Sequence, residues 1–169
     1  MINGEPSDVG MPLSEVMAVL TSLRSASCDF WVAGGWAVDA LVGRQTRPHR
    51  GLDLAVDAEH ETAAVDTLSL LGYAIETDWR AVRVELVAPS RGWVDVHPVT
   101  FDRTGHGRQA DVSGGHFDYP PEAFTNGTLG GVVVPCLSRE QQLRFHSGYQ
   151  PRPADLRDLQ LLERLASSH

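Results

Sequence analysis

Apolar side chains recur along the chain at two different spacings, and the spacing separates predicted helices from predicted strands. A repeat of three or four residues is typical of an amphipathic helix, whereas strict alternation is typical of a strand with one buried face. The repeat predicts helices over residues 12–25, 34–42, 60–71, 138–145 and 156–165. Alternation, or a short apolar run, predicts strands over residues 30–33, 51–57, 73–77, 82–87, 93–101 and 131–136. This order of elements predicts an α/β (α+β) fold in which a mixed sheet is flanked by helices.

The length of 169 residues predicts a single domain, because a chain of this size builds one substantial core. Residues 1–11 are rich in glycine, proline and acidic side chains, and we expect a loose arm there. Residues 12–136 should form the core of sheet and helices. Residues 137–169 should form two C-terminal helices that pack on one another and line the far side of a cleft.

Residues 102–126 are polar and glycine-rich, and one short strand pair is expected within them. Loops of this kind often carry recognition. The aromatic residues Phe117, Tyr119 and Phe124 could form a wall for a base or an acceptor. The alternative is a surface hairpin.

Charge and composition narrow the classes of partner. With 22 Asp and Glu against 14 Lys and Arg, the formal net charge is -8, which argues against nucleic acid, because phosphate backbones bind basic surfaces. The net negative charge fits a cationic small molecule as the partner, or it serves only to keep the protein soluble. No apolar run approaches the roughly 20 residues that span a bilayer, and no leader segment is evident, so we expect no membrane partner and a cytoplasmic location. Cys28 and Cys136 match no zinc or disulfide pattern and should be buried thiols.

The stretch from Phe30 to Asp57, FWVAGGWAVDALVGRQTRPHRGLDLAVD, carries the candidate chemistry. Gly34 and Gly35 stand where a strand turns into a helix, so unpaired backbone N–H groups there could bind a phosphate. The loop after this helix holds Arg44, Arg47, His49 and Arg50. In the strand that follows, alternation sends the leucines and the valine to the core and Asp53 to the opposite face. A carboxylate beside a glycine turn and several cations is what metal-assisted phosphoryl or nucleotidyl transfer needs.

The sequence GGWAVDALVGRQTRPHRGLDLAVD resembles the signature of the small antibiotic nucleotidyltransferases of the polymerase-beta-like superfamily, in particular the aminoglycoside and lincosamide nucleotidyltransferases. The similarity continues in WVDVHPV (Trp93–Val99) and in CLSREQQLRFHSGYQPRPADLRDLQLL, and it spans roughly residues 12–165. It implies the minimal fold of that superfamily, with C-terminal helices that close the cleft. It also implies a resistance-type enzyme that transfers a nucleoside monophosphate from a magnesium-bound nucleoside triphosphate, most simply ATP, to a hydroxyl of a small-molecule antibiotic.

The resemblance also assigns roles to individual residues. The positions that would bind the triphosphate are Gly34, Gly35, Arg44, Arg47 and His49. Asp53 and Asp95 would hold magnesium, and Asp95, or a water that it orients, would activate the acceptor hydroxyl. His97 is interpreted as a structural histidine, while His146 and Tyr149 would have a supporting role.

One position departs from the family pattern, which has acidic residues at 51 and 53, whereas this chain has Gly51-Leu52-Asp53. Asp57 shares the face of Asp53 but lies about 13 Å away along a strand, too far to share one ion. Glu85 and His49 are the candidates to replace the missing carboxylate. Alternatively, Gly51 serves a bulge or a close backbone approach. Two functions therefore stay open: an active nucleotidyltransferase, or a weak or inactive relative that binds a nucleotide or a drug.

Overall fold

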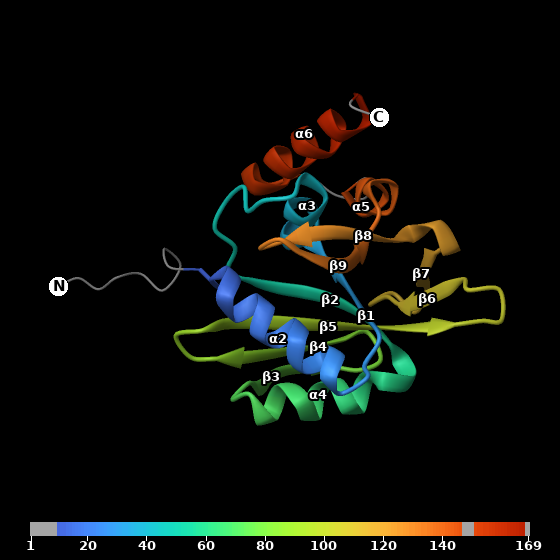
Figure 1. Cartoon of the computed structure of the whole chain (residues 1–169). Helices are drawn as coiled ribbons and strands as arrows, with labels where there is room; N and C mark the ends of the chain where they lie inside the picture. The colour runs from blue at the N-terminus through green and yellow to red at the C-terminus, as the bar shows by residue number, and fades with distance from the viewer. Residues whose placement is uncertain (1–9, 147–150, 168–169) are drawn as a thin grey trace.

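The computed structural model describes residues 10–146 and 151–167. Within them, nine strands build a mixed sheet in the order β3-β4-β5-β2-β1-β9-β8, and the hairpin β6–β7 continues from the end of β5 (Figure 1). The strands are β1 (Phe30–Ala33), β2 (Gly51–Asp57), β3 (Ala74–Trp79), β4 (Arg83–Ala88), β5 (Gly92–Phe101), β6 (Gly107–Ala110), β7 (His116–Tyr119), β8 (Phe124–Leu129) and β9 (Val132–Leu137). Because β2 pairs antiparallel with β1 and parallel with β5, the predicted mixed sheet is confirmed.

The helices lie in two groups around this sheet. They are α2 (Leu13–Ser25), α3 (Gly34–Val42), α4 (Glu61–Leu70), α5 (Arg139–His146) and α6 (Pro153–Ser167), with short 3-10 turns at Ala58–His60 and Pro121–Ala123. Figure 1 shows α2 and α4 along one side of the sheet, whereas α3, α5 and α6 gather near β8 and β9. The predicted contact between the two C-terminal helices is confirmed, since the Arg139 side chain of α5 donates to the Leu162 carbonyl of α6 at 2.6 Å.

Alternation along β2 and β5 decides which side of the sheet becomes core. The side chains that form the main cluster with α2 and α4 include Leu52, Leu54, Val56, Val94 and Val96, all 1% exposed or less. Odd-numbered positions of both strands therefore face the other way. That opposite face carries Asp53 and Asp95, so the burial of the core residues positions both carboxylates.

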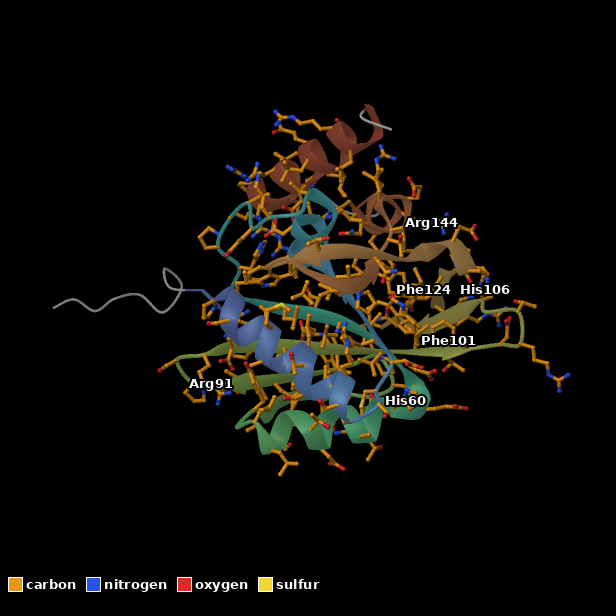
Figure 2. The ribbon with its side chains drawn as sticks, viewed as in Figure 1. His60, Arg91, Phe101, His106, Phe124 and Arg144 are labelled. Carbon is orange, nitrogen blue, oxygen red and sulfur yellow. The ribbon has the colours of Figure 1, made fainter. Side chains whose placement is uncertain are left out.

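The aromatic residues of the polar stretch pack against neighbouring aromatic rings. Phe124 contacts Phe101 at a centroid separation of 5.3 Å, Trp31 at 4.6 Å and Tyr119 at 5.8 Å. Figure 2 shows Phe101 and Phe124 side by side near the β6–β7 hairpin. Phe117 packs edge-on against Phe145. Tyr119 and Phe124 therefore belong to a second, smaller core, whereas Phe117 is 44% exposed, and a wall for a ligand stays a prediction.

Other boundaries differ from the prediction in small ways. The short strand pair expected between 102 and 126 is present as β6 and β7, but the same stretch also begins β8. Residues 1–9 of the predicted arm lie outside the described residues, whereas Met11 is 1% exposed and its N–H donates to the His49 carbonyl.

Cys28 and Cys136 are buried free thiols, as expected. Among the helices of the described residues, none combines the length and apolar character needed to cross a bilayer.

Leu54 tests how strongly the central strand holds this fold. It is fully buried in β2, so Leu54→Ala should lower the free energy of unfolding by about 2–5 kcal/mol through lost burial and a residual cavity. Leu70→Ala, at a residue that is 90% exposed on α4, is the matched control and should change it by less than about 0.5 kcal/mol. Chemical denaturation measures both, and equal losses would contradict the assignment of β2 to the core.

Candidate active site

A row of three carboxylates crosses the exposed face of the central strands. In the register of the sheet, Asp53 of β2 lies opposite Asp95 of β5, and Asp95 lies opposite Glu85 of β4. Neighbouring strands are about 4.8 Å apart, so adjacent carboxylates of this row come within reach of one cation. One ligand atom each from Asp53, Asp95 and His97 already lies within 4.8 Å of the others. Carboxylate oxygens are the ligands that magnesium prefers, so Asp53 and Asp95 are the residues that could hold such an ion.

The two aspartates are electrostatically unequal. Loss of hydration and, after it, the neighbouring charge of Asp53 together raise the pKa of Asp95 to about 6. Loss of hydration also acts on Asp53, but the hydrogen bond and charge of His97, with Asp95 and Arg83, outweigh it and lower the pKa of Asp53. Arg83 contacts Asp95 at 3.0 Å and Glu85 at 3.8 Å. Two carboxylates whose pKa values are pushed apart are suited to different tasks, one as a permanent anion and the other as a proton acceptor.

His97 belongs to this group, although the sequence suggested a purely structural histidine. Its Nε2 lies 3.5 Å from Oδ1 of Asp53, and its Nδ1 lies 3.2 Å from Nε2 of Gln109. The Gln109 carbonyl oxygen already accepts from the Tyr119 hydroxyl, so its amide nitrogen faces the histidine as a donor. His97 Nε2 consequently carries the hydrogen and points at Asp53. Its position two residues after Asp95, on the same face of β5, was the signal that sequence reasoning undervalued.

Gly34 and Gly35 begin α3 directly beside this row. Gly34 has a φ of +63°, and a Cβ there would lie 2.5 Å from Oδ2 of Asp53. A Cβ on Gly35 would lie 2.5 Å from Nδ1 of His49 and 2.8 Å from Nη2 of Arg47. The helix start at Ala33 has no side-chain cap within the described residues. The turn therefore presents uncapped backbone N–H groups in a space that a side chain would fill, as an anion site requires.

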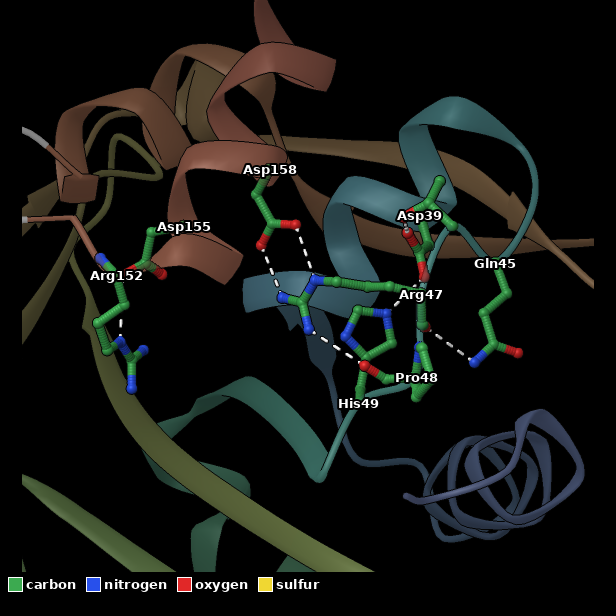
Figure 3. Close-up of polar contacts among 9 residues, drawn as sticks. Asp39, Gln45, Arg47, Pro48, His49, Arg152, Asp155 and Asp158 are labelled. Atoms are coloured by element: carbon green, nitrogen blue, oxygen red, sulfur yellow. Dashed lines mark hydrogen bonds and ion pairs between the residues drawn. The ribbon is translucent and has the colours of Figure 1, made fainter. Parts of the chain in front are cut away.

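The loop after α3 brings two of its three predicted phosphate ligands to the glycine turn (Figure 3). Arg47 reaches the turn while its guanidinium makes a bidentate ion pair with Asp158 of α6, at 3.1 and 2.9 Å. His49 is 4% exposed, and its Nε2 bonds to the buried carboxylate of Asp39. His49 can therefore offer only Nδ1, which faces Gly35, and among the described residues it is not part of the group whose ligand atoms gather around Asp53 and Asp95, so the structure does not support it as the replacement for the missing metal ligand.

Arg44 is the predicted phosphate ligand that the structure places elsewhere. It is exposed and follows the C-terminal end of α3, whereas Gly34 and Gly35 form the N-terminal end. The 9 residues of the helix separate the two ends by about 13 Å. Arg44 is also absent from the residues that line the central cavity, so the structure does not place it with the other predicted phosphate ligands, and its role stays a prediction.

Position 51 is occupied by glycine because the neighbouring strand β5 passes close to it. It pairs with Trp93 of β5, and a Cβ at position 51 would lie 2.6 Å from the Trp93 backbone oxygen. The interpretation as a close backbone approach therefore accounts for the glycine. Arg50 covers the exposed face of the Trp93 ring, with its guanidinium carbon 4.1 Å from the ring centroid. Of the two residues proposed to replace the missing carboxylate, Glu85 is the one that lies in the carboxylate row.

These parts enclose a cavity of about 440 Å³ between the sheet and the C-terminal helices. The lining residues are Gly34, Gly35, Arg47, His49, Arg50, Gly51, Leu52, Asp53, Glu85, Trp93, Asp95, Gln142, Phe145, His146, Arg152, Asp155 and Asp158. The predicted cleft is thus present, and His146 lines it as expected. Tyr149 lies outside the described residues.

A family model described as aminoglycoside-2''-adenylyltransferase matches residues 15–162. The chain belongs to the aminoglycoside-2''-adenylyltransferase family. It is similar to a lincosamide resistance protein of Staphylococcus haemolyticus, with 34% identity over 149 residues that cover 88% of this chain and 92% of the relative. This member of the family is accordingly a nucleotidyltransferase, and the resemblance seen in its sequence motifs is confirmed.

Two solved structures are similar to this chain. The lincomycin-bound lincosamide antibiotic adenylyltransferase LnuA has 33% identity and a TM-score of 0.84, with 92% of this chain and 99% of that chain covered. ANT(2'')-Ia in complex with adenylyl-2''-tobramycin has 19% identity and a TM-score of 0.71, with 92% of this chain and 88% of that chain covered. The second likeness shows that the two proteins share the fold.

The raised pKa of Asp95 predicts how stability depends on pH. The folded protein holds this proton more tightly than the unfolded chain does, so its free energy of unfolding should fall as pH rises from about 4 to about 7 without metal. Asp95→Asn removes the titrating group and should flatten this part of the profile. Melting temperatures across the range measure the effect, with Asp66→Asn on the exposed side of α4 as the control of equal charge. Parallel profiles for the wild type and Asp95→Asn would contradict the electrostatic assignment.

The contact between Gly51 and Trp93 predicts that restoring the family carboxylate costs stability. Gly51→Ala and Gly51→Asp should both lower the free energy of unfolding by about 1–3 kcal/mol, because either Cβ forces the two strands apart. Gly115→Ala is the control, since its Cβ meets only the side chain of Asp111 on an exposed turn. A Gly51→Asp protein of unchanged stability that binds magnesium more tightly would show that the strands adapt easily.

Proposed function

We propose that this enzyme transfers a nucleoside monophosphate, first of all AMP from ATP, to a hydroxyl of a small-molecule antibiotic of the lincosamide type. The observation that carries the proposal is the contact of the carboxylate row with the glycine turn inside one cavity. A phosphate held at the turn lies beside Asp53, where a divalent ion can bridge the two. Backbone donors, cations and carboxylates then surround the phosphate at which transfer takes place.

Each side chain would have a defined task in this reaction. When bound at Asp53 and Asp95, magnesium supplies positive charge to the phosphate oxygens. The N–H groups of Gly34 and Gly35 bind the triphosphate, and Arg47 lies beside them. Asp95, or a water that it orients, takes the proton of the acceptor hydroxyl as the hydroxyl oxygen attacks the α-phosphorus. The bond from this phosphorus to the bridging oxygen breaks, and pyrophosphate leaves with the electron pair.

The choice of acceptor rests on the extent of the similarities. The similarity to the lincosamide resistance protein covers 92% of that relative. A 2''-aminoglycoside nucleotidyltransferase of Escherichia coli is 33% identical over only 54 residues, which cover 30% of it. The acceptor-binding parts are therefore better matched to the lincosamide relative, and an aminoglycoside is the second choice.

Gly51 favours one alternative, a relative that binds a nucleotide or drug with little turnover. The strand beside it leaves no space for a carboxylate at position 51, and Arg83 already neutralises part of the row. An active enzyme would instead use Glu85 as the third acid of the site. Replacing Glu85 distinguishes the two functions. It should lower turnover in an active enzyme, whereas a binding protein has no turnover to lose.

Pyrophosphate release, measured with magnesium, each nucleoside triphosphate, and lincosamide or aminoglycoside acceptors, tests the proposal. The highest rate is expected with ATP and a lincosamide. Asp53→Asn and Asp95→Asn should each lower kcat by about two to four powers of ten, as expected for a lost metal ligand. Glu85→Gln should weaken magnesium binding, whereas Asp66→Asn should change neither quantity. Tight nucleotide binding without pyrophosphate release from any pair would favour the binding protein.

A further inference from the structure

A second cavity flanks the carboxylate row and has no task in the reaction described above. It encloses about 350 Å³ and is lined by Trp79 of β3, Arg80, Val82 and Val112, and we call it the lateral groove. Trp79 is 54% exposed and Val112 is 78% exposed, although both side chains are apolar. Exposed apolar side chains that gather around one hollow are typical of a ligand-binding surface.

Arg83 connects the lateral groove to the carboxylate row. Trp79 lies opposite Arg83 in the register of the sheet, and Arg83 lies two residues before Glu85, so all three side chains share the face that carries Asp95. The guanidinium carbon of Arg83 is 5.3 Å from the centroid of the Trp79 ring, and its Nη1 is 3.0 Å from Oδ1 of Asp95. Because a guanidinium C–N bond adds only about 1.3 Å, the Trp79 ring lies within about 10 Å of the Asp95 carboxylate. A small molecule of two linked rings spans this distance.

Gln109 holds the opposite wall of the lateral groove in place. Its amide nitrogen donates to the Val82 carbonyl at 3.4 Å and faces Nδ1 of His97 at 3.2 Å. Gln109 belongs to β6, and Val112 follows this strand in the turn between β6 and β7. The amide therefore ties the hairpin both to the start of β4 and to the histidine beside Asp53. Since the groove is preformed, less conformational entropy is lost when a ligand binds in it.

The charges around the lateral groove favour an apolar ligand over a polycationic one. Arg80 in its lining is paired with Asp78 at 3.1 Å, whereas Arg83 lies between the groove and the carboxylate row. A ligand with several ammonium groups that reached from the row into the groove would be repelled by the Arg83 guanidinium. An apolar substituent would instead remove the exposed surface of Trp79 and Val112 from water.

We propose that the lateral groove is the subsite that binds an apolar substituent of the acceptor, and that it selects an acceptor with an alkyl-bearing ring over a polycationic one. The acceptor hydroxyl lies at Asp95 while the substituent packs between Trp79 and Val112. The inference rests on the proposed function, because that function places the acceptor hydroxyl at Asp95. It goes beyond that function by naming the side chains that distinguish one acceptor from another.

Lincomycin, bound to the protein in the presence of the magnesium complex of α,β-methylene-ATP, is the probe, and calorimetry measures its affinity. Trp79→Ala should weaken lincomycin binding about tenfold, because the ring no longer covers the alkyl chain, whereas Trp79→Phe should stay within about threefold of the wild type. Val112→Ser should weaken binding about threefold. The matched control is Val133→Ser, at a valine of β9 that is 61% exposed and lies outside both cavities, and it should match the wild type.

A lincomycin analogue without the propyl chain on its proline ring separates a subsite from a general disturbance of the fold. Loss of the propyl chain should weaken binding to the wild type about tenfold and change binding to Trp79→Ala by less than about twofold, because the two groups contact one another. In pyrophosphate release, Trp79→Ala should raise KM for lincomycin and change kcat by less than about twofold, as expected for a contact made equally in the ground state and the transition state. Tobramycin, with its several ammonium groups, should bind more weakly than lincomycin and should not respond to Trp79→Ala.

Each result has a distinct meaning. Equal loss of both lincomycin compounds in Trp79→Ala would overturn the subsite and leave nucleotidyl transfer intact. Coupling between the propyl chain and Trp79, in a protein that releases no pyrophosphate with any acceptor, would support the subsite and reject the proposed transfer. Unchanged affinities in Trp79→Ala, together with a change from dimer to monomer in sedimentation, would assign the groove to a second copy of the chain and overturn the inference. Failure of the wild type to bind lincomycin would overturn both the subsite and the choice of a lincosamide acceptor.

Discussion

The parallel pairing of β2 with β5 is the constraint on which the site depends. It places Asp53 opposite Asp95, and a slip of one residue would turn one of the two carboxylates into the core. The register is held by the apolar side chains between the acids, of which Leu54 and Val96 lie opposite one another and are fully buried. Burial of the hydrophobic face thus supplies the free energy that keeps two repelling carboxylates side by side. Metal binding would then relieve a repulsion that folding has already imposed.

Local patterns were enough to predict this half of the site. The period of two assigned Asp53 to the open face of its strand, and the motif resemblance singled out Asp95 and the pair Gly34-Gly35. What sequence could not supply was contact between distant segments. Arg47 and Asp158 are 111 residues apart, and no local pattern connects them. Asp39 had a weaker signal, since an acid among alanine and valine in a short helix suggests a buried partner, but the partner itself depended on the path of the following loop.

The departure at Gly51 shows why one residue cannot be judged without its neighbour. By the family pattern, glycine there is a missing ligand, whereas in the sheet it is the residue that lets Trp93 approach. Both statements hold, because the close approach of Trp93 to Gly51 also leaves no space for a carboxylate at position 51. Since Arg50 stacks on the same ring, the space where an acid would stand is bordered by an aromatic face and a cation. The electrostatic character at this edge of the cavity is therefore opposite to the one that the family pattern implies.

Two basic side chains of the cavity, Arg47 and His49, are each held by a buried acid, and this determines how the C-terminal helices take part. Asp158 of α6 is 3% exposed and fixes the Arg47 guanidinium by two bonds, while Asp39 of α3 fixes the ring of His49. Each basic group reaches the glycine turn already oriented, so less side-chain entropy is lost when an anion binds. Because one of the two supporting acids comes from α6, the phosphate side of the cavity is complete only when that helix is packed in place. The sheet alone therefore carries the row of acids, and the last helix of the chain orients the basic side chain that a polyanion at the glycine turn would meet.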